Sequence, residues 1–152
     1  MNITALQRKQ LSGKIAGMGH LAQALPPIGG WIKALRTALG MSLEQLGNKL
    51  GVSRQSVMAL EIREKRQSIT LKSLSEVAEA MDMKLVYALV PKDGSLEALI
   101  ERKAEELARK IITRTSQSMK LEGQENSPGR LAEAFEERKA EILQKLPKAL
   151  WD

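Results

Sequence analysis

The sequence predicts a mostly α-helical protein in which a helical domain is followed by one short β-strand and a helical C-terminal region. Three patterns in the 152 residues predict this order. Residues 42–61, SLEQLGNKLGVSRQSVMALE, place apolar side chains at helical spacing between polar caps. Residues 84–90, KLVYALV, are rich in strand-forming residues and end at Pro91. Beyond Pro91 the chain returns to charged helical repeats.

The first region, residues 1–26, is basic and carries loosely spaced apolar residues that could form a helix. Pro26 and Pro27 would end that helix before the helical domain begins. The helical domain itself is expected over residues 27–82. Its helices are predicted at 28–39, 43–50, 54–60 and 71–81.

Caps and a sharp turn define these helices. Ser42 and Gln45 form a capping-box pattern at the start of the second helix, and Thr70 caps the last one. Gly51 lies where the second helix must stop, because glycine adopts a positive φ at little cost. Ser53 is a good N-cap for the third helix. Two helices are therefore expected to be joined by a tight turn.

The third helix would present polar side chains on its first turn. Arg54 suits the N7 and O6 edge of guanine, and Gln55 suits the N7 and N6 edge of adenine. This arrangement predicts a helix-turn-helix that binds double-stranded DNA, the alternative being an ordinary helical hairpin. The residues expected to contact DNA are Ser42, Ser53, Arg54, Gln55, Ser56, Ala59, Arg63, Lys65 and Arg66.

Positive charge is unevenly placed along the chain. Residues 1–40 hold five basic residues and no acidic residue, whereas residues 91–152 hold twelve of each. The unopposed cations adjoin the helix-turn-helix motif in the sequence, so we expect them to contact phosphates. The alternative is a solvated charged face.

Residues 31–81 resemble the phage-repressor-like (Xre) helix-turn-helix family. The resemblance implies a five-helix repressor-like domain, with a connecting helix around 62–68. It also implies a structural ion pair between Arg36 and Glu61, which would join the first helix to the end of the third. The alternative is two independent surface charges.

A wider resemblance covers nearly the whole chain. GWIKALRTALGMSLEQLGNKLGVSRQSVMALE, ITLKSLSEVAEAMDMKLVYALVP, SLEALIERKAEELARKI, TSQSMKLEG and the terminal LWD resemble the mobile mystery protein A family. Those are small helix-turn-helix proteins of bacterial mobile elements, typically encoded beside a Fic-domain protein. The resemblance implies an autoregulating repressor that acts as the antitoxin partner of a Fic-domain protein. The alternative is a stand-alone operator-binding regulator with no toxin-inhibiting role.

Residues 83–91 are predicted to be a lone strand. A lone strand leaves its backbone N–H and C=O groups unpaired, so a partner strand from a second copy is expected. The sequence therefore predicts a homodimer with an antiparallel ribbon across its axis. The alternatives are a continuation of the preceding helix or a segment packed on the core.

The C-terminal region, residues 92–152, is predicted to contain two charged amphipathic helices. Ser95 caps the first, which should run to about Leu121. Residues 123–129, GQENSPG, form a loop, and Ser127 and Pro128 start the second helix, which Pro147 ends. These helices could fold as a hairpin on the core or dock on a partner.

One short string within this region matches a known inhibitory pattern. Ser118, Glu122 and Gly123 fit the motif of Fic regulation, a Ser or Thr, three residues, then Glu and Gly or Asn. In such systems the glutamate pairs with an arginine of the Fic enzyme and occupies space that the γ-phosphate needs. The alternative is that Glu122 is a solvated residue at a helix end.

Composition argues against several other classes. The chain has no cysteine and a single histidine, so no disulfide, metal site or other cofactor is expected. Its four aromatic residues are too few for a base-stacking RNA-binding module. No phosphate-binding glycine loop and no nucleophile with a plausible base is visible, so no enzymatic activity is expected. Lacking an apolar run of about 20 residues and a signal peptide, the protein is expected to be cytoplasmic, without membrane contact.

Overall fold

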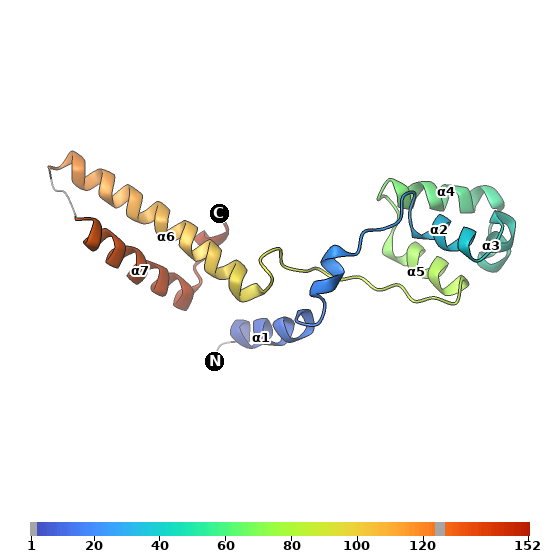
Figure 1. The fold of residues 1–152 in the computed structure, drawn as a ribbon, viewed down its shortest axis with the longest axis horizontal. Helices are drawn as coiled ribbons and strands as arrows, with labels where there is room; N and C mark the ends of the chain where they lie inside the picture. The colour runs from blue at the N-terminus through green and yellow to red at the C-terminus, as the bar shows by residue number, and fades with distance from the viewer. Residues whose placement is uncertain (1–2, 124–126) are drawn as a thin grey trace. The chain divides into compact units, whose positions relative to one another are not determined.

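A computed structural model describes residues 3–123 and 127–152, and this part of the chain is all-helical. The helices are α1 (Ile3–Ile15), η1 (Gly19–Gln23), α2 (Trp31–Ala38), α3 (Leu43–Leu50), α4 (Arg54–Lys65), α5 (Leu71–Ala80), α6 (Leu96–Leu121), α7 (Pro128–Lys145) and η2 (Lys148–Trp151). They belong to two compact units (Figure 1). Residues 20–88 form one unit, and residues 1–19 with 89–152 form the other.

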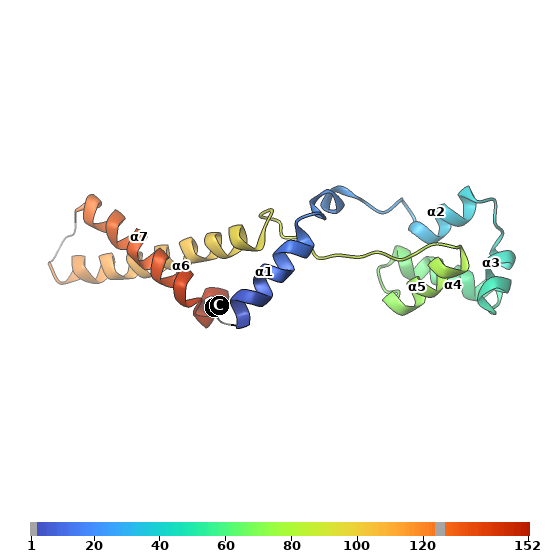
Figure 2. The ribbon, with the colours of Figure 1, turned by 90° about the horizontal axis from the view of Figure 1, so that it is seen from below.

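The unit of residues 20–88 is built by α2, α3, α4 and α5, which lie together in Figure 2. These four helices pack around one apolar cluster. Each helix contributes one side chain that is at most 1% exposed: Ile32, Leu46, Val57 and Val77. Fully burying such a side chain contributes about 1.5–3 kcal/mol relative to leaving it in water. This cluster therefore holds the four helices in one arrangement.

The predicted helix boundaries of this unit are confirmed where caps define them. Both bonds of the capping box are present, from the Gln45 amide to Ser42 Oγ (3.0 Å) and from the Ser42 amide to Gln45 Oε1 (2.8 Å). Gly51 has φ 70° and ends α3, as the sharp turn requires. Thr70 accepts a hydrogen bond from the Ser73 amide at the start of α5 (3.1 Å).

The connecting helix expected around 62–68 is not a separate element. The helix that begins at Arg54 continues without a break to Lys65, and Arg66 is its C-cap. No glycine or proline interrupts residues 54–65, so the backbone hydrogen bonds persist through them. The chain then turns at Gln67, which has φ 59°. The unit consequently contains four α-helices after residue 30 rather than five.

The predicted β-strand is also wrong. Residues 84–90 form no strand, and the described part of the chain contains none. The segment does not continue α5, which ends at Ala80. Val86, Tyr87 and Leu89 are 68%, 70% and 91% exposed, so these three side chains do not pack on a core. The composition of KLVYALV favours a strand locally, but a strand needs a second backbone to accept its hydrogen bonds. The described residues of the chain supply no such backbone.

In the other unit, α6 and α7 run antiparallel as a helical hairpin (Figure 1). Its core is a narrow seam in which Ala104, Ala108, Ile142 and Leu150 are buried. Lys139 of α7 bonds two carboxylates of α6, Glu105 (2.9 Å) and Glu101 (3.2 Å). The two predicted C-terminal helices therefore pack on each other. They begin and end close to the residues expected from their caps. Part of the loop expected at 123–129, residues 124–126, lies outside the described residues.

The N-terminal helix is shorter than its apolar residues suggested, because α1 ends at Ile15. Ser12 Oγ of α1 donates a hydrogen bond to Glu97 of α6 at 2.7 Å. Residues 1–19, which hold three of the five N-terminal cations, belong with residues 89–152. Among the described residues, no helix has both the length and the apolar character needed to cross a membrane.

Candidate nucleic-acid interface

The first three residues of α4 are exposed at the surface. Ser53 is its N-cap, with its Oγ accepting a hydrogen bond from the Ser56 amide at 3.1 Å. The hydroxyl oxygens of Ser53 and Ser56 lie 3.0 Å apart. Arg54, Gln55 and Ser56 are all exposed. The cap fixes the start of the helix, so these side chains extend from a rigid turn.

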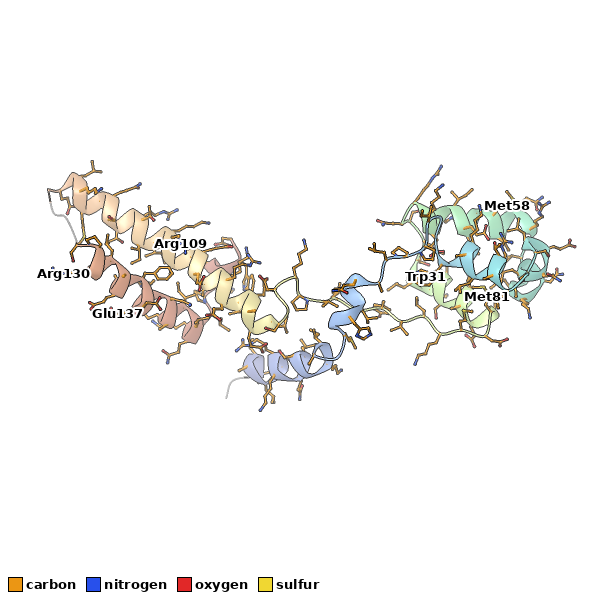
Figure 3. All side chains as sticks on the ribbon, in the orientation of Figure 1. Trp31, Met58, Met81, Arg109, Arg130 and Glu137 are labelled. Atoms are coloured by element: carbon orange, nitrogen blue, oxygen red, sulfur yellow. The ribbon has the colours of Figure 1, made fainter. Side chains whose placement is uncertain are left out.

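Farther along α4, two apolar side chains are also exposed. Met58, labelled in Figure 3, is 43% exposed, and Ile62 is 47% exposed. Their i, i+4 spacing places them on the same face of the helix. Sequence reasoning missed both of them, because apolar residues in a helix are first assigned to its core. On a helix that enters a major groove, apolar atoms contact the methyl group of thymine. Ala59, which was expected to contact DNA, is half-buried.

The two acidic residues of α4 both face inward. Glu61 accepts a hydrogen bond from Arg36 Nε of α2 at 2.6 Å, and Arg36 also donates to the Met41 carbonyl at 3.0 Å. The two side chains of this ion pair are only 13% and 11% exposed. The pair expected from the family resemblance is therefore present, and it joins α2 to α4.

Glu64 makes hydrogen bonds to the start of α2 that the sequence did not predict. Its carboxylate accepts hydrogen bonds from the amides of Trp31 (2.7 Å) and Ile32 (2.8 Å), the first two residues of α2. Gly30, the N-cap of α2, makes no side-chain cap hydrogen bond, so Glu64 supplies the cap from another helix. A Cβ at Gly30 would lie 2.6 Å from Glu64 Oε1, and the φ of 95° there also favours glycine. A glycine pair preceding a helix with no Ser, Thr, Asp or Asn cap is the signal that could have revealed it.

These inward contacts determine the charge of the outer face of α4. With Glu61 and Glu64 turned toward α2, the exposed charged side chains of α4 and its C-cap are all cationic. They are Arg54, Arg63, Lys65 and Arg66. Among the described residues, none of the four forms an ion pair. Unpaired cations on both ends of one exposed helix suit contact with phosphates.

A cleft of about 270 Å³ borders the same helix. Ser56, Ala59 and Arg63 line it from α4, and Ser73 and Glu76 line it from α5. Three of the residues expected to contact DNA therefore lie side by side on one flank of α4. Ser42 is separate from them, exposed at the start of α3, where its Oγ already holds the Gln45 amide.

The residues of the Fic-inhibitory candidate lie in the other unit, at the end of α6. Glu122 is the C-cap of α6, and its amide donates to the Ser118 carbonyl at 3.1 Å. Gly123 has φ 76° and follows the cap. Ser118, Glu122 and Gly123 are all exposed. In the described residues, no group of three or more His, Cys, Asp or Glu side chains could hold a metal ion.

Comparison with known families agrees with this geometry. Residues 32–87 match the family model described as Helix-turn-helix, and the match spans α2 to α5. No curated protein and no solved structure matches the chain. The comparisons thus support an Xre-type helix-turn-helix domain. They give no support to the resemblance to the mobile mystery protein A family. Residues 32–87 form a helix-turn-helix domain, which implies sequence-specific DNA binding and is typical of regulators without enzymatic activity.

Proposed function

We propose that this protein is a transcriptional repressor that reads its operator with the first turn of α4. The observation that carries the proposal is the exposed, capped turn at Arg54 and Gln55 on a helix whose only two acidic residues face inward. A helix of this kind enters the major groove with its N-terminal residues on the base edges. Repression follows when the operator overlaps a promoter.

We divide the contacts by chemistry. Arg54 and Gln55 read bases, because their side chains form bidentate bonds with guanine and adenine. The hydroxyls of Ser42, Ser53 and Ser56 contact phosphate or sugar, and Met58 and Ile62 contact thymine methyl groups. Arg63, Lys65 and Arg66 contact phosphates, which position the domain without reading sequence.

The test is selection of binding sites from a random duplex library by the full-length protein. The proposal predicts that a defined motif is enriched over successive rounds. Specific sites are typically bound at least about 1,000-fold more tightly than random DNA at physiological salt. Binding that stays equal for all sequences would overturn the proposal.

Binding as a homodimer is a finer part of this proposal. The exposed apolar side chains of Val86, Tyr87 and Leu89 support self-association, since large apolar side chains gain by leaving water. A dimer would read two half-sites about 34 Å apart, or a multiple of that distance. The proposal predicts a palindromic selected motif, and a Tyr87→Ser, Leu89→Ser variant that sediments as a lighter species. A wild-type protein that is monomeric at operator-saturating concentration contradicts it.

An antitoxin role is a second, finer proposal. Ser118 and Glu122 lie one helical turn apart, both exposed at the end of α6, so a partner enzyme could reach them. In this proposal, Glu122 pairs with an arginine of a Fic adenylyltransferase and blocks its γ-phosphate site. Co-purification with the product of the neighbouring gene tests the partnership. Glu122→Gly should raise transfer from labelled ATP while the complex stays intact, and unchanged transfer in an intact complex contradicts the role.

A further inference from the structure

The charges of α6 are segregated along its length. Four acidic residues lie in its first half: Glu97, Glu101, Glu105 and Glu106. No acidic residue occurs in residues 107–121. That stretch instead holds four basic residues: Arg109, Lys110, Arg114 and Lys120.

The two halves also differ in how their cations are used. In the first half, Arg102 bonds Asp93 (2.7 Å) and Glu106 (2.9 Å), and Lys103 lies 3.4 Å from Glu106. The four cations of the second half are exposed, and in the described part of the chain none of them forms an ion pair. Arg109 lies with its guanidinium 5.8 Å from the centre of the Phe135 ring (Figure 3). No described residue of the hairpin therefore neutralises the positive charge of this half.

These cations share an outward face. Helical spacing places Lys110 and Arg114 four residues apart, with Thr113 and Gln117 exposed between the cations. Like charges at this spacing cost a helix about 0.2–0.5 kcal/mol, so the pattern does not stabilise α6. The helix dipole favours cations only in the last turn, which here contains Lys120 alone of the four.

We propose that this face of α6, the α6 cationic face, is a second surface for the phosphate backbone of double-stranded DNA. It is defined by Lys110, Thr113, Arg114, Gln117 and Lys120, with Arg109 at its edge. From Arg109 to Lys120 the helix rises about 16 Å. One strand of B-DNA carries about five phosphates over that length. The proposal rests on the proposed function, because the DNA that α4 reads supplies the polyanion.

Charge complementarity favours DNA over an anionic membrane as the occupant. A helix that lies on a membrane needs an apolar face with Trp, Phe or Leu free to enter the lipid. The apolar side of α6 is instead packed in the hairpin, where Ala104 and Ala108 are buried and Leu107 and Ile111 pack on the same cluster. Leu121, the last residue of α6, is its one large apolar side chain that is mostly exposed, and a single leucine does not make an apolar face. The groups between the cations are hydroxyl and amide side chains, which donate hydrogen bonds to phosphate oxygens.

The experiment compares two triple variants of the full-length protein on the selected operator and on random duplex. The first is Lys110→Gln, Arg114→Gln, Lys120→Gln, which removes three charges from the α6 cationic face. The matched control is Arg130→Gln, Lys145→Gln, Lys148→Gln, which removes three exposed charges elsewhere in the same unit. The readout is the slope of log affinity against log salt concentration, with circular dichroism to show that each variant is folded.

Each lost phosphate contact lowers the slope by about 0.9, so the α6 variant should lose up to about 2.7. Its affinity should fall by about tenfold or more at low salt, equally on both duplexes, so that operator preference is kept. The control should retain the wild-type slope. Equal slopes for the α6 variant and wild type, or equal losses in both variants, would overturn the inference while operator preference still stands. If the α6 variant instead lost binding to anionic phospholipid vesicles while its DNA slope stayed at the wild-type value, the face would be assigned to membranes. That result would also overturn the inference.

Discussion

The two units of this protein are both helical, but different forces hold them together. In residues 20–88 each of four helices buries one large apolar side chain. Hydrogen bonds from α2 to Glu61 and Glu64 also join α2 to α4. In the hairpin the seam is narrow, with alanine at two of its four buried positions. Charged side chains at the surface, such as Lys139, complete that contact.

This difference explains which charges are left for a ligand. In the helix-turn-helix unit the acidic residues of α4 are used in internal contacts, so its cations remain unpaired at the surface. In the hairpin the surface ion pairs use the cations in the first half of α6 and leave those of the second half. Internal contacts in the helix-turn-helix unit and surface ion pairs in the hairpin thus determine where each unit carries unopposed positive charge.

The largest expected effect comes from the apolar cluster of the helix-turn-helix unit. Leu46→Ala should lower the free energy of unfolding of this unit by about 2–5 kcal/mol, because the side chain is 0% exposed and leaves a cavity. The matched change in the hairpin, Ala104→Gly, should cost that unit about 1 kcal/mol. Hydrogen exchange resolved by residue measures both. Equal loss of protection in both units after Leu46→Ala would contradict two separate cores.

The next effect concerns the ion pair between α2 and α4. Glu61→Gln should lower the free energy of unfolding by about 1.5–3 kcal/mol, because Arg36 would lose its carboxylate partner in a nearly buried site. Glu44→Gln, at an exposed position in the first turn of α3, is the control and should change little. Urea unfolding followed by Trp31 fluorescence, with Trp151 replaced by Phe in every variant so that it does not contribute, gives both values. Identical midpoints for the wild type and Glu61→Gln would show that the pair adds nothing.

A smaller effect is expected at the cap that Glu64 provides. Glu64→Ala should cost about 0.5–2 kcal/mol, the usual loss when a helix N-cap is removed. Gly30→Ala should be at least as harmful, since its Cβ would lie 2.6 Å from the Glu64 carboxylate and its φ is 95°. A double-mutant cycle measures the coupling between the two positions. Strictly additive losses would mean that Gly30 is needed for its backbone conformation alone.

The smallest effect is a dependence of hairpin stability on acid pH. The hydrogen bond from Arg102 lowers the pKa of Asp93, and the hydrogen bond from Ser12 lowers the pKa of Glu97. A carboxyl whose pKa is lower in the folded state stabilises the fold above its unfolded pKa. That contribution is lost as pH falls through the folded value, here below the ordinary 3.8 and 4.5. Thermal unfolding of the hairpin between pH 6 and about 2 should show a shallow decline, which Asp93→Asn should reduce.

The parts of the fold that were predictable depend on local chemistry. Ser42, Gly51 and Ser53 specify their helix ends through bonds to neighbours three or four residues away, so α3 and the start of α4 follow from the sequence. The end of α4 was predicted too early, because the five-helix order implied by the family resemblance was followed although no glycine or proline breaks the helix before Lys65. The strand prediction was wrong for a different reason. Residues 84–90 have a composition typical of strands, but composition does not show whether a second backbone is present to pair with them.

The candidate site was predictable to a similar extent. Arg54, Gln55 and Ser56 lie on an exposed turn as expected, although their contacts with DNA stay a prediction. Glu64 was missed because its bond joins residues 33 apart, and no local pattern marks the acceptor. Met58 and Ile62 were missed because exposure depends on how α4 packs. Long-range hydrogen bonds and the exposure of helix faces both depend on tertiary contacts.

The central claim, that α4 reads bases through Arg54, is tested most directly by comparing two variants on two duplexes. Arg54→Ala should weaken binding to the selected operator by about 1–3 kcal/mol, five- to 150-fold, and have a smaller effect on random DNA. Lys65→Ala, which removes a phosphate contact, should weaken both duplexes equally and reduce the salt slope by about 1. Titrations of both proteins at several salt concentrations separate these outcomes. Equal losses for Arg54→Ala on operator and random DNA would contradict the account.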